Sequence, residues 1–183
     1  MTQTARPTGP RPARPAAACV LVGLLAALAP AAPAVAAEAG RNVARGEYLA
    51  RIMDCGGCHT TGALLGRPDA ARYLAGSEVG FEIPGLGIFY PPNLTPEPTD
   101  GLGSWSEADI VTVLRTGMRP DGRQLAPAMP WRSYAALTDD DATSLAAFLR
   151  SLPPVAGPAP THVGHAEKPT APYMTVVMPA QSK

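Results

Sequence analysis

Three residues within one short stretch, Cys55, Cys58 and His59, have the types and the spacing to hold a porphyrin. The spacing Cys-x-x-Cys-His is the attachment signature of a c-type haem. Each thiol can add to one vinyl group of the porphyrin as a thioether, and the adjacent histidine can bind the iron through an imidazole nitrogen. The intervening Gly56 and Gly57 have no Cβ, which lets the chain turn tightly against a flat ring. The stretch therefore predicts one covalent haem c, attached at Cys55 and Cys58, with His59 as an axial ligand.

A disulfide, a redox dithiol and a zinc site are the alternatives for this cysteine pair. An oxidising compartment would allow a disulfide, but a bond across two residues closes almost no loop and stabilises little. Zinc would need further ligands, and beyond the motif the chain offers only the distant His162 and His165 as additional histidines. We favour the haem because it also explains His59.

A haem with one histidine ligand either binds a sixth ligand or leaves its iron open. Met129 is the candidate, because Pro127 and Pro130 flank it and fix the backbone around it. A rigid loop reduces the entropy lost when a weak thioether ligand is ordered. Methionine ligation also raises the reduction potential relative to two histidines. The rivals for this position are Met118, Met174, Met178, His162 and His165.

The first 37 residues have the pattern of a secretory signal peptide. Residues 1–14 carry three arginines, an apolar run follows over residues 16–29, and small residues at 34–37 offer a cleavage site. The run has 14 residues, fewer than the roughly 18 expected of a membrane-spanning helix. We expect an exported, periplasmic protein cleaved near Ala37, with an uncleaved N-terminal anchor as the alternative.

The charge balance argues against nucleic acid as a partner. The whole chain has 15 basic and 15 acidic residues, and loss of the three leader arginines leaves 12 basic against 15 acidic. A protein that binds nucleic acid or anionic lipid through its charge has a strongly basic patch instead.

Helical spacing of apolar residues predicts three helices, over residues 41–54, 104–117 and 138–152. Ser104…Glu107 and Ser106…Asp109 both fit a capping box at the start of the second helix, and Thr138 fits the N-cap of the third. Gly117 stands where the second helix should end.

The remaining segments are rich in glycine and proline. Residues 60–90 read as loop with room for one short hairpin. Residues 154–183 read as a proline-rich linker or wrapping tail. Trp105 and Trp131 are expected to pack beside the haem, where either indole N–H could also bind a propionate.

With these motifs in place, the chain resembles the class I c-type cytochromes. The closer resemblance is to bacterial mono-haem proteins and to single domains of the multihaem cytochrome c subunits of membrane dehydrogenases, and it is carried by residues 93–98, 103–106 and 119–123. It implies a small all-α cytochrome c fold over residues 41–153, with crossing first and last helices and a loop-rich middle that wraps one haem. It also implies His59 and Met129 as the axial ligands. The multihaem relatives repeat the motif three times, whereas this chain has it once.

The leading hypothesis is an exported electron carrier, not an enzyme, that passes single electrons between redox partner proteins, one of them a dehydrogenase. The first alternative is a haem subunit held permanently in a periplasmic oxidoreductase complex. The apolar run Tyr173–Met178 in the tail suits docking on such a partner, and equally suits packing on its own domain. The second alternative is a haem enzyme with an open or switched sixth site. Membrane association would come through a partner or an uncleaved leader.

Overall fold

The computed structural model describes residue 9 and residues 32–179. The predicted apolar run over residues 16–29 therefore lies outside the described residues, and the predicted cleavage position after Ala37 lies within the first helix. The described helices and strands are, in chain order, α1 (Ala32–Ile52), α2 (Cys55–His59), two 3-10 helices η1 (Ala63–Leu65) and η2 (Ala70–Arg72), β1 (Gly80–Ile83), β2 (Gly87–Phe89), α3 (Glu107–Thr116), α4 (Trp131–Tyr134), α5 (Asp139–Ser151), β3 (Val163–Gly164) and β4 (Tyr173–Met174).

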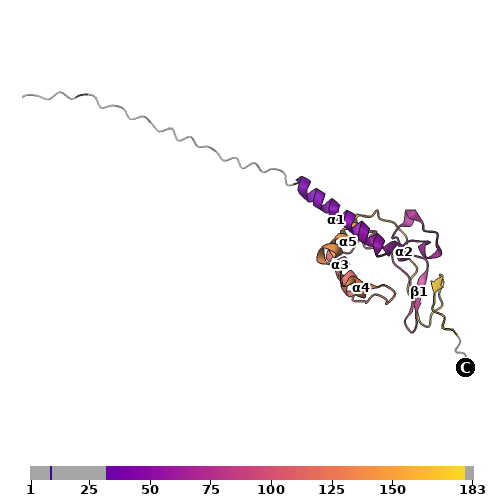
Figure 1. Ribbon diagram of the computed structural model, residues 1–183. Helices are drawn as coiled ribbons and strands as arrows, with labels where there is room; N and C mark the ends of the chain where they lie inside the picture. Colours follow the sequence, from indigo (N-terminus) through magenta and orange to yellow (C-terminus); the bar gives the residue numbers. More distant parts are fainter. Residues whose placement is uncertain (1–8, 10–31, 180–183) are drawn as a thin grey trace, which may run out of the picture. The chain divides into compact units, whose positions relative to one another are not determined.

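Helices α1, α3 and α5 form the helical core (Figure 1). Helix α1 packs closely on α5 at Gly46, where a Cβ would lie 2.0 Å from the carbonyl oxygen of Ser144 and 2.6 Å from Cβ of Phe148. The two backbones can approach this closely only because Gly46 has no side chain. The contact agrees with the expectation that the first and last helices cross. The buried apolar core around it consists of Leu49, Ala50, Leu74, Ile110, Leu114, Leu145, Ala146, Phe148 and Leu149.

The ends of α3 and α5 are fixed by local caps that the sequence predicted. Ser106 is the N-cap of α3 and forms a complete capping box with Asp109, so of the two predicted boxes the second is the one present. Gly117 ends α3 in the left-handed region, with φ 71°. Thr138 caps α5 through its side chain, which accepts a hydrogen bond from the N–H of Asp141.

The expectation of an all-α fold is wrong in one respect, because the described chain also contains a four-stranded sheet of order β3-β2-β1-β4. Strands β1 and β2 form the short antiparallel hairpin expected within residues 60–90, with Phe81 opposite Phe89. The two outer strands come from the tail: β3 pairs antiparallel with β2, and β4 pairs parallel with β1. Each outer strand has only two residues, too few for an alternating pattern to appear in the sequence.

The tail beyond residue 153 is attached to the rest of the described chain at several points between residues 155 and 174. Beyond the two strands, the hydroxyl of Tyr90 donates to the carbonyl of Ala171 at 2.9 Å, and the N–H of Gly157 donates to a carboxylate oxygen of Asp100 at 3.0 Å. Of the two predictions for this segment, the wrapping tail is the one that the contacts support. No helix among residues 32–179 is both long and apolar enough to cross a membrane.

Candidate haem-attachment site

Helix α2 brings the three predicted attachment residues onto little more than one helical turn. Helix α1 ends at Ile52, and the chain turns at Asp54, which has the left-handed φ of 54°. Cys55 and Cys58 follow at positions i and i+3, which share one side of a helix. Both thiols are half-buried and free of any disulfide within the described part of the chain. The two thiols are therefore placed to react with the same flat molecule.

The two glycines of the motif are required by their protein neighbours as well. A Cβ on Gly57 would lie 2.3 Å from a carboxylate oxygen of Asp54, and one on Gly56 would lie 2.9 Å from the ring of Tyr73. The sequence interpretation assigned both glycines to close approach of a porphyrin. The structure adds a second reason, which is the packing of Asp54 and Tyr73 over the motif.

His59 is buried, with 6% of its surface exposed, and its ring orientation is fixed. Its Nδ1 lies 2.8 Å from the carbonyl oxygen of Pro92. A carbonyl can only accept, so Nδ1 carries the proton and Nε2 is left with a free lone pair. Among the described residues every fully buried side-chain nitrogen or oxygen has a hydrogen-bond partner. Nε2 has none, so it must reach open space rather than be sealed inside the protein. The fixed ring of His59, with a protonated Nδ1 and a free Nε2, fits an iron ligand.

Burial lowers the pKa of His59, and the hydrogen bond to Pro92 opposes that shift. The neutral imidazole is the form that binds iron. A ligating histidine typically donates its second ring N–H to a carbonyl or carboxylate, which fixes the tautomer and makes the ligand more basic. The arrangement of His59 and Pro92 matches that requirement.

The protonation of the cysteines argues against the redox-dithiol alternative. Burial raises the pKa of Cys55 to about 11, and the nearby Asp54 contributes to the rise. Burial and Asp54 likewise raise the pKa of Cys58. A redox-active cysteine needs the opposite, a lowered pKa and an electropositive surrounding.

Met129 lies half-buried on the loop between α3 and α4. Its N–H donates to the carbonyl of Ala126 at 3.0 Å, and its carbonyl accepts from the N–H of Trp131 at 2.9 Å. The ring of Trp131 packs on Gly117 at the end of α3, where a Cβ would lie 2.5 Å from the ring. The backbone around Met129 is therefore ordered, as the flanking prolines predicted.

The helix that follows Met129 reaches the cysteine motif. The hydroxyl of Tyr134 in α4 lies 3.4 Å from the carbonyl of Met53, two residues before Cys55. The pKa of Tyr134 is raised to about 12, first by burial and then by the neighbouring Cys55 and Cys58. The structure thus brings α4 beside α2. Ligation of the iron by Met129 stays a prediction.

The rival ligands lie in other surroundings. Met118 is 42% exposed after the end of α3, and Met174 and Met178 are exposed on the tail. The ring of His162 stacks on Phe89 with centroids 4.3 Å apart, and its Nδ1 lies 2.9 Å from the carbonyl oxygen of Ile88. His162 is therefore already engaged in the sheet.

Both tryptophans are half-buried and are covered by arginines. The guanidinium of Arg119 lies 5.5 Å from the ring centroid of Trp105, and that of Arg132 lies 4.4 Å from the ring of Trp131. Trp105 also packs against the main apolar core. Propionate binding by either indole stays a hypothesis.

Known proteins resemble this chain over the same region. The family model described as "Cytochrome c" matches residues 43–153. The cytochrome c subunit of the quinone-dependent alcohol dehydrogenase of Gluconobacter oxydans is 42% identical over 115 residues, which cover 62% of this chain and 22% of the relative. The fructose dehydrogenase cytochrome subunit of Gluconobacter japonicus is 40% identical over 121 residues, 65% of this chain and 23% of the relative. The gluconate 2-dehydrogenase cytochrome c subunit of Pantoea cypripedii is 38% identical over 115 residues, 62% of this chain and 24% of the relative. The aligned region spans less than a quarter of the length of each of these relatives.

Proposed function

Since the chain belongs to the cytochrome c family, we propose that it is an exported electron-transfer protein with one covalently attached haem c. Thioether bonds at Cys55 and Cys58 would hold the haem, and His59 and Met129 would bind its iron. The haem supplies a single iron that alternates between the ferric and ferrous states. The protein is then an electron carrier rather than an enzyme, in keeping with relatives that are named as cytochrome subunits of dehydrogenases.

The observation that carries this proposal is the state of His59. Its Nδ1 is held by the carbonyl of Pro92 at 2.8 Å, and the remaining nitrogen is unprotonated and free. Two free thiols lie on the same short helix. A structural core histidine would instead have both ring nitrogens engaged by the protein.

The prediction of Met129 as the sixth ligand is tested by one spectrum. A ferric haem with a thioether ligand has a weak near-infrared band, which we expect in the wild-type protein and in Met118→Ala. Met129→Ala should lose this band, since no sulfur would then bind the iron. Met118 is the matched control because it lies on the same connection between α3 and α4 and is exposed.

Two outcomes of that spectrum would contradict the proposal. A wild-type ferric haem that is high-spin and binds added ligands would favour the enzyme with an open sixth site. A band that persists in Met129→Ala would assign the ligand to another residue.

One observation favours the alternative of a haem subunit held in a larger complex. The tail carries Val176, Val177 and Met178 with 78%, 82% and 75% of their surfaces exposed. Of the two readings of this apolar run, packing on its own domain applies only to β4, which pairs with β1. Exposed apolar side chains in a row are typical of a surface that a partner covers.

Size-exclusion chromatography of protein purified from its native source distinguishes the two forms. Elution with a dehydrogenase subunit supports the complex, and elution at the size of the monomer supports the free carrier. Export is tested on the same material, because a mature N-terminus near residue 38 in the periplasmic fraction supports cleavage of the predicted leader. An N-terminus at Met1 in the membrane fraction would support an uncleaved anchor.

A further inference from the structure

The Pro92 carbonyl, which accepts a hydrogen bond from the buried His59, lies in a short loop that the protein fixes from two sides. On one side, the carbonyl of Pro91 accepts from the N–H of Ser77 at 3.1 Å, and the N–H of Leu94 donates to the carbonyl of Leu74 at 2.8 Å. These two backbone bonds bracket Pro92 and tie its loop to residues 74–77.

The second anchor comes from the C-terminal tail through a network of buried hydrogen bonds. The side-chain N–H of Asn93 donates to the carbonyl of Val155 at 2.7 Å. The side-chain oxygen of Asn93 accepts from both the N–H and the hydroxyl of Thr95, at 2.9 and 2.7 Å. The N–H of Val155 donates to the Thr95 hydroxyl oxygen at 3.2 Å. Asn93 is 1% exposed and Thr95 is 0% exposed, so these bonds form away from water, where an unmatched partner is costly.

The network also involves Asn93-Leu94-Thr95, which has the sequence of a glycosylation sequon. A glycosylation acceptor must present its amide nitrogen at the surface. The amide of Asn93 is instead buried and occupied by the tail. The side chain of Asn93 therefore serves to hold the tail.

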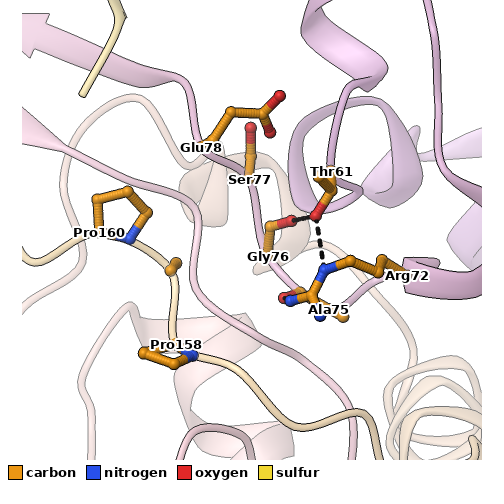
Figure 2. A pocket seen from close by; sticks show the side chains of 9 residues that line it. Thr61, Arg72, Ala75, Gly76, Ser77, Glu78, Pro158 and Pro160 are labelled. Atoms are coloured by element: carbon orange, nitrogen blue, oxygen red, sulfur yellow. Dashed lines mark hydrogen bonds between the residues drawn. The ribbon is translucent and has the colours of Figure 1, made fainter.

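Packing holds the tail against the same loop. A Cβ on Gly76 would lie 3.2 Å from that of Ala159 and 3.3 Å from the carbonyl oxygen of Pro91. Figure 2 shows Pro158 and Pro160 of the tail across from Gly76. These residues line a cavity of about 200 Å³. The tail therefore packs next to the loop that carries the Pro92 carbonyl.

We propose that Asn93 and Thr95 are positioning residues for the axial ligand. With Val155 they form a clamp (Asn93, Thr95 and Val155) that holds Pro92 in place, so that its carbonyl stays on Nδ1 of His59. The inference rests on the proposed function for the role of His59 as ligand. The family model ends at residue 153, so one half of this clamp comes from a part of the chain that lies outside the matched region.

The clamp therefore influences the basicity of the His59 imidazole. A hydrogen bond from Nδ1 to a carbonyl fixes the ring and makes the imidazole more basic. A more basic ligand favours the ferric state, and loosening the clamp should therefore raise the reduction potential. Loss of a direct hydrogen-bond partner of a metal ligand typically lowers metal affinity or activity by roughly 10- to 100-fold. The clamp acts only indirectly, through Pro92, so we expect a smaller effect on the ferric–ferrous equilibrium.

The test compares two variants of the haem-loaded protein. Thr95→Val removes the hydroxyl but keeps the shape of the buried side chain. Asp100→Ala removes the bond to the N–H of Gly157, which attaches the tail two residues further along. We expect Thr95→Val to shift the ferric–ferrous equilibrium two- to tenfold toward the ferrous state, where tenfold equals 59 mV for one electron. Asp100→Ala and the hydroxyl-keeping Thr95→Ser should retain the wild-type potential.

A second measurement does not depend on a variant folding or on the potential. In the wild-type protein, hydrogen exchange of the His59 Nδ1 proton and of the Val155 amide should show the same protection, because both open when the clamp opens. Protection factors that differ by more than tenfold between the two protons would overturn the proposal. An unshifted potential in Thr95→Val, or an equal shift in Asp100→Ala, would also overturn it. A wild-type protein without haem would refute the proposed function, and the exchange comparison would still decide the clamp.

Discussion

Replacing Gly46 with alanine should destabilise the protein, although alanine is the better helix former. Within a helix, alanine is favoured over glycine by about 1 kcal/mol, so an unhindered Gly46→Ala would be stabilising. At this position the new Cβ would lie 2.0 Å from the carbonyl oxygen of Ser144, 2.7 Å from its carbonyl carbon and 2.6 Å from Cβ of Phe148. Two of these atoms are backbone and the third is fixed to it, so no side-chain rotation relieves the contact.

The expected size of the effect follows from the shift that the helices must make. Ordinary contacts of a Cβ are 3.4–4 Å, so α1 must move away from α5 by more than an ångström at the crossing. That shift loosens the packing of Leu49 and Leu145, which lie in the buried core. Overpacking of this kind destabilises a protein by about 3 kcal/mol at the upper end. The gain in helix propensity offsets about 1 kcal/mol of that loss. A net loss of about 2 kcal/mol should lower the urea midpoint by roughly 1 M.

The assay is urea unfolding followed by far-ultraviolet circular dichroism on haem-loaded protein. Ala44→Gly is the matched control, because Ala44 is exposed on the same helix and this change measures propensity alone. We expect both variants to be destabilised, Gly46→Ala more than Ala44→Gly. A Gly46→Ala protein as stable as the wild type would refute the close crossing of α1 and α5.

Three further changes test the caps and the attachments of the described chain. Ser106→Ala removes the side-chain acceptor that caps α3 and should lower the free energy of unfolding by about 1 kcal/mol, measured by urea unfolding. The guanidinium of Arg45 holds the pKa of Asp141 below its ordinary value of 3.8. The stabilisation from the ionised Asp141 is present above that value and is lost as the pH falls through the lowered pKa, so the wild type should exceed Asp141→Asn in stability near neutral pH and converge with it in acid. Tyr90→Phe removes the 2.9 Å hydrogen bond to the carbonyl of Ala171 and should cost about 1 kcal/mol. Limited proteolysis should then cleave the tail faster than in the wild type, and an unchanged rate would argue against this attachment.

Local patterns carried enough information to predict the helical part of the fold. The capping box of Ser106, the helix end at Gly117 and the N-cap at Thr138 each depend on a few neighbouring residues, and all three are present. The motif at Cys55–His59 likewise depends on spacing alone. The membership of the cytochrome c family, predicted from these motifs, is confirmed.

The outer strands of the sheet and the support of His59 could not be predicted, because both depend on pairs of residues far apart in the chain. Strand β4 pairs with β1 across some 90 residues, and each outer strand has only two residues. The partner of His59 is a backbone carbonyl, which every residue has, so nothing in the sequence marks Pro92. Helix α4 with Tyr134 was also missed, because its four residues are too few for a helical period.

The way in which the residues after 153 are attached could not be predicted from the sequence either. Their proline content predicted a linker or wrapping tail, and only the structure shows which carbonyls and N–H groups attach it. The bond from the buried side chain of Asn93 to the carbonyl of Val155 joins residues far apart in the chain, and no local pattern marks it.

The central claim is a haem bound covalently at Cys55 and Cys58, and the intact mass of the protein after acid–acetone extraction tests it most directly. We predict that the wild-type polypeptide keeps its colour and carries the added mass of one haem, and that the Cys55→Ser, Cys58→Ser double variant carries none. A colourless wild-type polypeptide with the unmodified mass would contradict the account.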